Sequence, residues 1–176
     1  MPFLAETLGT IGGVSFDVRG LIQLDSGAYE GENVSRSDRG KTFGQLAKKE
    51  FPNRVNGIRV DQMTPLIHFV MACRTSRGTN SGPVASIAVH YEDGTQSTID
   101  LIYRDTIGDF DNGPGLEINL DQVATRNRNP RLGDLQDRIT WHLAWKNPEP
   151  NRKVSHLDFV SSKKNTAPFL IAVTVE

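Results

Sequence analysis

Cysteine is nearly absent from this chain of 176 residues, since Cys73 is the only one. A single thiol cannot close an intrachain disulfide, and no spacing of cysteine with histidine matches a structural zinc site. Because Cys73 ends an apolar run that begins at Leu66, we expect it to be a buried and unreactive residue of the core.

Long apolar runs are also absent. No run approaches the roughly 18 residues of a membrane-spanning helix, so we expect no membrane insertion. The opening residues Met1–Glu6 have neither the basic start nor the apolar stretch of a signal peptide. The chain is therefore either a cytoplasmic protein or a domain of a longer exported protein, and the sequence leaves both open.

Neither sign of charge is in excess. Lys and Arg together number 20 and Asp and Glu 21, which gives a net charge of −1 and none of the broad basic surface that nucleic acid requires. Hydrophobic residues make up 37% and charged residues 23%, a balance that excludes a disordered chain. The length and the lack of repeats or linkers predict one domain over residues 1–176.

The motifs of common enzyme classes are missing as well. The sequence has no G-x-S-x-G elbow, no P-loop and no G-x-G-x-x-G pattern. Its histidines, His68, His90, His142 and His156, lie inside expected strands and are not spaced as ligand pairs of the H-x-H or H-E-x-x-H kind. We therefore expect these four residues to be structural.

What the sequence does contain is a series of short segments rich in Val, Ile, Phe and Thr, which is typical of β-strands. Asp93-Gly94 between two such segments predicts a β-hairpin. Helix is expected at 42–51 and 120–124 only. The expected strands are 14–18, 21–24, 57–60, 66–73, 84–91, 96–103, 139–145, 154–160 and 169–175.

Short strands separated by turns predict an all-β fold, a β-sandwich or jelly roll. Two connections, 25–41 and 104–138, are long, polar and rich in Gly, Asn, Asp and Arg. Long loops of a compact domain commonly carry function, so we expect any ligand to bind at these two segments.

Several stretches resemble a poorly characterised family of bacterial galactose-binding-like β-sandwich domains. They are Gly13–Leu24, Val89–Gly94, Trp145–Pro150 and Leu157–Glu176, together with the run around His68-Phe69. The resemblance implies a jelly-roll sandwich that binds carbohydrate as one module of a larger extracellular or cell-envelope protein. It implies no individual site residue.

The chain departs from the family pattern at two places. The family tends to have an aromatic pair after the aspartate that follows the hairpin, where this chain reads Asp109-Phe110-Asp111. The family often shows a second histidine after the first apolar strand, where this chain has Met71.

The segment 108–113 places Asp109, Asp111 and Asn112 together in what we expect to be a tight turn. Carboxylate and amide oxygens are the ligands that calcium prefers, so these three residues are the candidate metal site. The alternative is a solvated turn, rich in Asp and Asn, that binds no ion.

Aromatic rings offer surfaces on which a sugar can stack. Trp141 and Trp145 share one face of their strand, and we expect that face, at Trp145 above all, to lie in the core. Tyr29 and Phe110 lie in the two polar segments and are the candidate stacking rings, although each could instead pack on the edge of its own sandwich.

Arg104 ends a strand close to these polar segments. Guanidinium groups bind sugar hydroxyls and carboxylates, so Arg104 is a candidate ligand residue, with ordinary surface charge as the alternative. The expected binding set combines an arginine with the loop residues already named, and it consists of Tyr29, Arg104, Asp109, Phe110 and Asn112.

The sequence thus predicts a non-catalytic carbohydrate-binding module with a polysaccharide or glycan partner. Two alternatives remain, a small glycan-active hydrolase or lyase on the same fold and a structural spacer domain. Because this functional prediction depends on analogy between folds, it needs a site to support it.

Overall fold

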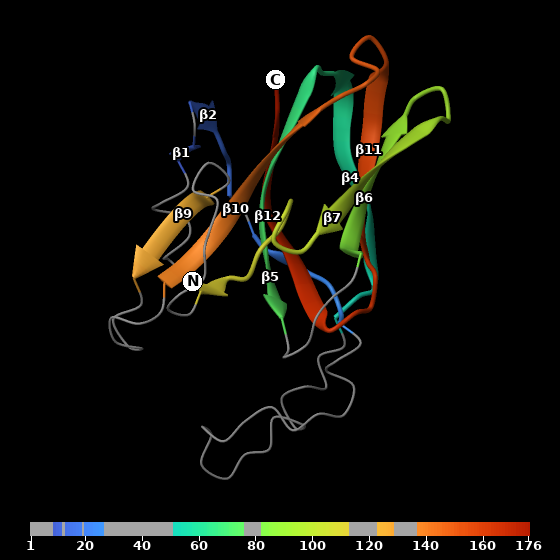
Figure 1. Ribbon diagram of the computed structural model, residues 1–176. Coiled ribbons are helices and arrows are strands. Elements are labelled where there is room, and N and C mark those ends of the chain that lie inside the picture. Colours follow the sequence, from blue (N-terminus) through green and yellow to red (C-terminus); the bar gives the residue numbers. More distant parts are fainter. Residues whose placement is uncertain are drawn as a thin grey trace.

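The computed structural model describes residues 9–11, 13–18, 20–26, 51–75, 82–112, 123–128 and 137–176 (Figure 1). Every regular element within these ranges is a β-strand, and all strand pairs are antiparallel. In these same ranges we find no helix with the length and apolar character that crossing a membrane needs. The all-β prediction is confirmed for this part of the chain.

The larger sheet has six strands, and the central strands are long and rich in Ile, Val, Phe and Ala. Five strands follow the order β3-β12-β5-β10-β8, and β9 pairs with β10 away from this path. The strands are β3 (Ile22–Gln23), β12 (Thr166–Val175), β5 (Leu66–Thr75), β10 (Asp137–Lys146), β8 (Asp111–Asn112) and β9 (Val123–Arg128).

The smaller sheet has four strands in the order β4-β11-β6-β7. They are β4 (Arg54–Met63), β11 (Lys153–Ser161), β6 (Pro83–Tyr91) and β7 (Gln96–Ile102). A two-stranded hairpin of β1 (Thr10–Ile11) and β2 (Val14–Ser15) completes the described elements.

The chain passes repeatedly from one sheet to the other through short connections. Residues 64–65 join β4 to β5, residues 147–152 join β10 to β11, and residues 162–165 join β11 to β12 (Figure 1). These three pairs of consecutive strands therefore lie in different layers, an arrangement typical of a β-sandwich.

The main core lies between the two sheets. Buried side chains such as Phe69 and Met71 of β5 belong to one hydrophobic cluster with Ile87 of β6 and Leu157 and Phe159 of β11. Cys73 is buried in this cluster, as predicted. Because residues of both sheets contribute to one core, the architecture is β-sandwich-like.

A second cluster combines residues of the N-terminal segment with the larger sheet. Val14 and Phe16 pack with Val70, Ala72 and several residues of β10 and β12. In this way the N-terminal segment shields apolar side chains of β5 that alternate with those of the main core.

Each of the nine expected strand ranges contains a strand. The hairpin at Asp93-Gly94 is confirmed, since β6 pairs with β7 in a register that sets His90 opposite Gln96. Gly94 has a φ of 85°, a conformation that glycine adopts without steric cost.

Two expectations about the polar segments are wrong. Residues 123–124, expected to be helical, form the start of β9 because they pair with β10. The segment 104–138 is not one long loop, since it contains β8, β9 and the first residues of β10. Val-Ala-Thr-Arg-Asn-Arg has only two apolar residues and so gives no strand pattern in the sequence, and the strand is identified by its pairing with β10. Residues 27–50, which include the other expected helix (42–51) except for Phe51, lie outside the described residues.

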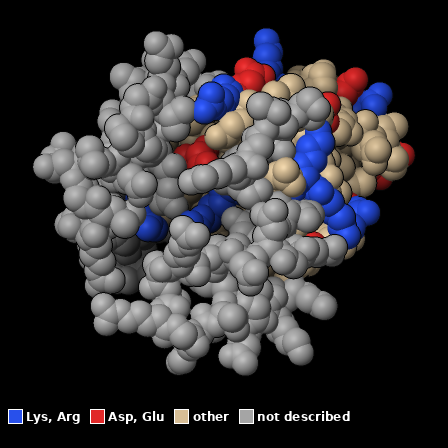
Figure 2. Space-filling view, turned by 60° about the horizontal axis from the view of Figure 1, so that its bottom comes forward, with Lys and Arg blue, Asp and Glu red and all other residues tan. Residues whose placement is uncertain are grey.

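The tryptophans reverse the expected order of burial. Trp141 is 6% exposed and belongs to the second cluster, whereas Trp145 is partly buried against the main core. The face of the molecule shown in Figure 2 carries both basic and acidic side chains of the described residues. This mixture agrees with the near-equal numbers of basic and acidic residues in the sequence.

Candidate functional site

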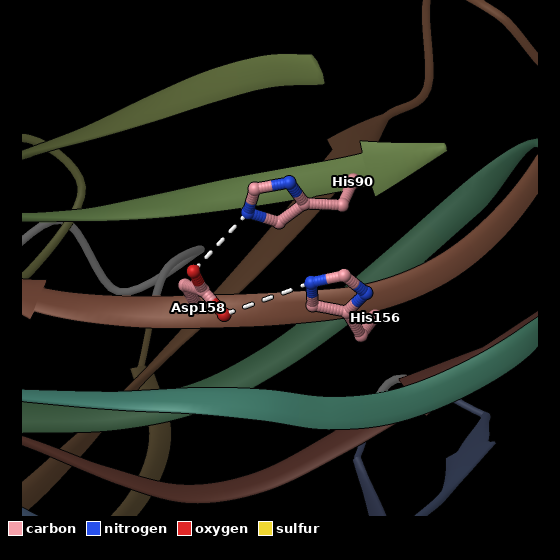
Figure 3. A group of neighbouring side chains, drawn as sticks. All are labelled: His90, His156 and Asp158. Carbon is pink, nitrogen blue, oxygen red and sulfur yellow. Dashed lines mark hydrogen bonds and ion pairs between the residues drawn. The ribbon is translucent and has the colours of Figure 1, made fainter. Parts of the chain in front are cut away.

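Three titratable side chains meet on the outward face of the four-stranded sheet. Along β11, Leu157 and Phe159 belong to the core, and His156 and Asp158 alternate with them. On β6 the same alternation turns His90 outward. Because His156 lies opposite His90 in the pairing of the two strands, the three groups are neighbours (Figure 3).

Both imidazole rings present Nε2 to the Asp158 carboxylate (Figure 3). His90 Nε2 is 3.2 Å from Oδ2, and His156 Nε2 is 3.9 Å from Oδ1. The rings stack with centroids 4.3 Å apart and planes inclined by 8°. One ligand atom from each residue lies within 4.8 Å of the other two, so the group has the composition and spacing of a metal-ion site.

Ser155 determines which nitrogen of His156 carries the proton. The Ser155 hydroxyl donates to the His90 carbonyl at 3.0 Å, so its only hydrogen is used. The 2.9 Å contact between Ser155 Oγ and His156 Nδ1 must then be donated by Nδ1–H. In the neutral ring, Nε2 therefore carries a lone pair and faces the carboxylate as a second acceptor.

Strand β4 holds the carboxylate from the other side. Gly57 N–H donates to Asp158 Oδ1 at 2.9 Å, and Arg54 Nη2 donates to Oδ2 at 3.0 Å. The pairing of β4 with β11 shifts register between Leu157 and Phe159, where Asp158 lies, and Gly57 has a φ of 73°. A bulge with glycine in a left-handed conformation therefore turns the backbone N–H toward Asp158.

Opposing effects act on the pKa of Asp158. Burial of the carboxyl group is the largest of them and raises the pKa. The Gly57 N–H bond, the nearby His90 and the Arg54 guanidinium together outweigh burial, so the pKa lies below its ordinary value. Asp158 is therefore an anion at neutral pH, as a metal ligand must be.

The sequence predicted structural roles for the four histidines and did not bring these residues together. One signal was present, because His156 and Asp158 are two positions apart in a strand and must share a face. His90 lies 68 positions from Asp158, and only the pairing of β6 with β11 makes them neighbours.

The other two histidines form a pair on the larger sheet. His68 Nδ1 is 3.0 Å from His142 Nε2, and the rings stack with centroids 5.2 Å apart. The buried His68 Nε2 has no hydrogen-bond partner among the described residues and lies 3.6 Å from Glu176 Oε2. Burial, followed by the proximity of His68, lowers the pKa of His142.

The candidate residues of the second polar segment lie apart from this cluster of His90, His156 and Asp158. Phe110 is half-buried, meets the Phe169 ring edge to face and has the Arg138 guanidinium 5.1 Å from its ring centre. The backbone of Asp109 forms an isolated parallel β-bridge with Cys73, and the Asp109 carbonyl accepts a 3.5 Å hydrogen bond from Trp141 Nε1.

Arg104 is exposed, with a φ of 67°, and its guanidinium carbon lies 5.5 Å from the centre of the Tyr103 ring. Asp111 and Asn112 are not in a tight turn, because they form β8 and pair with Arg138 and Asp137. The side chains of Asp111 and Asn112 and the whole of Tyr29 lie outside the described residues.

Comparison with known proteins identifies no relative. The chain matches no family model, no curated protein and no solved structure. The geometry of His90, His156 and Asp158 is therefore the strongest guide to function.

Proposed function

We propose that this protein binds a divalent transition-metal ion between His90, His156 and Asp158. Two imidazole nitrogens and a carboxylate oxygen form a donor set that suits zinc, and the same set binds iron in other proteins. Calcium and magnesium prefer oxygen ligands and fit this group poorly.

The observation that carries the proposal is the pair of facing acceptors. His156 Nε2, whose proton is on Nδ1, lies 3.9 Å from the Asp158 carboxylate. Two acceptors that face each other repel unless a cation lies between them. A proton on Nε2 or a metal ion satisfies both, and the second imidazole at His90 adds a third ligand on the same side.

One of the two measured distances between ligand atoms fits a metal ion shared by the residues. Two ligand atoms at about 2.0–2.2 Å from one ion are roughly 3.0–3.4 Å apart for octahedral or tetrahedral angles. The 3.2 Å from His90 Nε2 to Asp158 Oδ2 falls in this range. The 3.9 Å from His156 Nε2 is longer, and this ring lies stacked on His90, so metal binding requires the His156 ring to turn toward the carboxylate.

The outer hydrogen bonds support the same assignment. Metal-binding histidines generally donate their other ring N–H to an oxygen, which fixes the tautomer and the ring orientation. His156 has this arrangement with Ser155, and the Asp158 carboxylate is oriented by the hydrogen bond that it accepts from Gly57 N–H. Three protein ligands leave at least one coordination position open to an external molecule.

A thermal-shift experiment tests the proposal. Zinc added to EDTA-treated protein should raise the melting temperature, because an ion that binds only the folded chain stabilises it by about 2.7 kcal/mol at a hundredfold excess over Kd. His90→Gln and His156→Gln should abolish the shift. His142→Gln, which replaces a histidine of the other sheet, should retain it.

An unchanged melting temperature with zinc, or an equal shift in His156→Gln, would contradict this site. Calcium is measured in parallel, since Asp109, Asp111 and Asn112 remain our proposed calcium ligands. A calcium-dependent shift that persists in His156→Gln would support that second set.

Our second candidate function is carbohydrate binding on a jelly-roll sandwich of the galactose-binding type. Support comes from the two antiparallel layers and from the resemblance of the strand sequences. The proposed partner is a polysaccharide outside the cell or in its envelope, bound by one module of a larger protein without turnover.

Affinity electrophoresis tests this function. Gels that contain single polysaccharides should retard the parent protein, and repeating them with zinc and with EDTA shows whether the two proposed functions are linked. Equal mobility in every gel would count against carbohydrate binding. Release of reducing ends or unsaturated products would support the hydrolase or lyase alternative.

A further inference from the structure

The geometry points to a carboxylate as the external ligand of this site. We propose that a carboxylate-bearing molecule occupies the open position of the metal ion and is held at the same time by the guanidinium of Arg54. This inference rests on the proposed metal site and names the class of ligand that the site selects.

Two hydrogen bonds hold Arg54 beside the proposed ion, but they occupy only some of its N–H groups. Its Nη2 donates to Asp158 Oδ2 at 3.0 Å, and its Nε donates to Asn56 Oδ1 at 2.6 Å. A guanidinium has five N–H groups, so three remain without a partner among the described residues. The side chain is 53% exposed, whereas that of Asp158 is 8% exposed, so ligands reach Arg54 from solvent.

The distance between the Arg54 guanidinium and the proposed ion is one that a carboxylate can bridge. A nitrogen 3.0 Å from a ligand oxygen is at most about 5 Å from an ion bound to that oxygen. A carboxylate with one oxygen on the ion at about 2 Å and the other on an N–H group at about 2.8 Å spans a similar length.

Charge favours an anion over a neutral ligand. Asp158 neutralises only half the charge of a divalent ion, and Arg54 adds a further positive charge beside it. The remaining cation on this part of β4, Arg59, is already paired with Asp61 and contributes no net charge. A neutral hydroxyl leaves this excess in place, whereas a carboxylate reduces it and accepts hydrogen bonds from the planar guanidinium.

Cobalt-loaded protein provides the test, because the visible spectrum of bound Co²⁺ responds to a change in its ligands. Sodium acetate and D-galacturonate are titrated at constant ionic strength and pH 7, with D-galactose as the neutral match of the acidic sugar. We expect saturable spectral changes with both carboxylates and none with D-galactose.

Arg54→Gln loses a contact to the metal ligand Asp158, so it is saturated with cobalt before the titration. The saturated variant should bind acetate at least about tenfold more weakly, because a charge-assisted hydrogen bond is lost. Arg59→Gln is the matched control and should behave like the parent, since Arg59 is paired elsewhere. Arg54→Lys is measured beside Arg54→Gln because it keeps the charge next to Asp158, and its acetate affinity should lie between the two.

The outcomes separate the two proposals. A parent protein that shows no spectrum of bound cobalt overturns the metal site itself. A parent that binds cobalt but does not respond to acetate or D-galacturonate overturns only the carboxylate ligand. Equal acetate affinity in the parent, Arg54→Gln and Arg54→Lys shows that Arg54 is not part of the site.

Discussion

Asn147 is the residue that joins the turns at one end of the two sheets. It is 2% exposed, and its Nδ2 donates to the Thr64 carbonyl at 2.8 Å. Its Oδ1 accepts hydrogen bonds from Tyr91 Oη at 2.7 Å and from Glu149 N–H at 2.9 Å. One side chain thus connects the β4–β5 turn, the end of β6 and the β10–β11 turn.

We predict that Asn147→Ala lowers the free energy of unfolding by about 2–4 kcal/mol. The substitution removes the Asn147 partner of the Thr64 carbonyl and of the Glu149 N–H group, and it leaves the Tyr91 hydroxyl with only its 3.3 Å contact to Ser97 Oγ. Each lost buried hydrogen bond costs about 1–3 kcal/mol before relaxation or water entry. Urea unfolding at pH 7 measures the change. A loss below about 0.5 kcal/mol would show that Asn147 is dispensable.

Gly108 is required by the packing of Trp141. A Cβ atom at this position would overlap the indole ring, while the Gly108 carbonyl accepts a 2.9 Å hydrogen bond from the N–H of Cys73. The segment cannot move away from the ring without breaking that bond. The glycine is therefore explained by close approach of the backbone to a side chain.

We predict that Gly108→Ala destabilises the fold by more than about 2 kcal/mol and changes the tryptophan emission, because overpacking displaces the ring. Gly20→Ala is the control, since a Cβ atom there meets no neighbour within 4 Å, and its effect should stay within about 0.5 kcal/mol. Equal stability of the two variants would contradict the packing argument.

At the scale of elements, the neighbouring strands β5 and β10 carry His68 and His142 as a coupled pair. Their ring nitrogens are 3.0 Å apart, and a positive charge on His142 is disfavoured by burial and by the nearby His68 ring. Phe16 of the N-terminal segment meets the His142 ring edge to face at a centroid distance of 6.1 Å.

We predict that this pair makes the fold sensitive to acid. The pKa of His142 is lowered by burial and by His68, so the unfolded chain binds more protons once the pH falls below about 6.5. The stability contributed by the neutral ring is complete above that pH and decreases as the pH falls toward the folded-state pKa. The decrease should be small, because solvent screens a partly exposed ring.

Urea unfolding at pH 7.5, 6.5 and 5.5 in EDTA checks this prediction. The free energy of unfolding should decrease less over this range in His142→Gln than in the parent. An equally steep decrease in both proteins would assign the acid sensitivity to other groups.

For the whole molecule, local sequence patterns located the strands but not their partners. The segments around Phe69 and Phe159 were recognisable because alternating or continuous apolar residues suit half-buried or fully buried strands. The strand β9 was missed, since its polar residues give no such alternation and its pairing with β10 supplies the missing stabilisation.

The candidate site was likewise predictable only where its residues are close together in the sequence. His156 and Asp158 could be placed on one face of a strand from their spacing alone. The contributions of His90, Arg54 and Gly57 come from two other strands, and the bulge that aims Gly57 N–H at the carboxylate leaves no pattern in the sequence beyond one glycine.

The sequence by itself determined the all-β class, the approximate strand ranges, the hairpin at Asp93-Gly94 and the burial of Cys73. These features depend on neighbours within a few residues, whose sterics and alternation act locally. The tertiary structure alone decided which strands pair and in which register, and therefore which outward side chains meet. Pairing results from competition among contacts distant in sequence, and a shift of one residue would turn His90 away from Asp158.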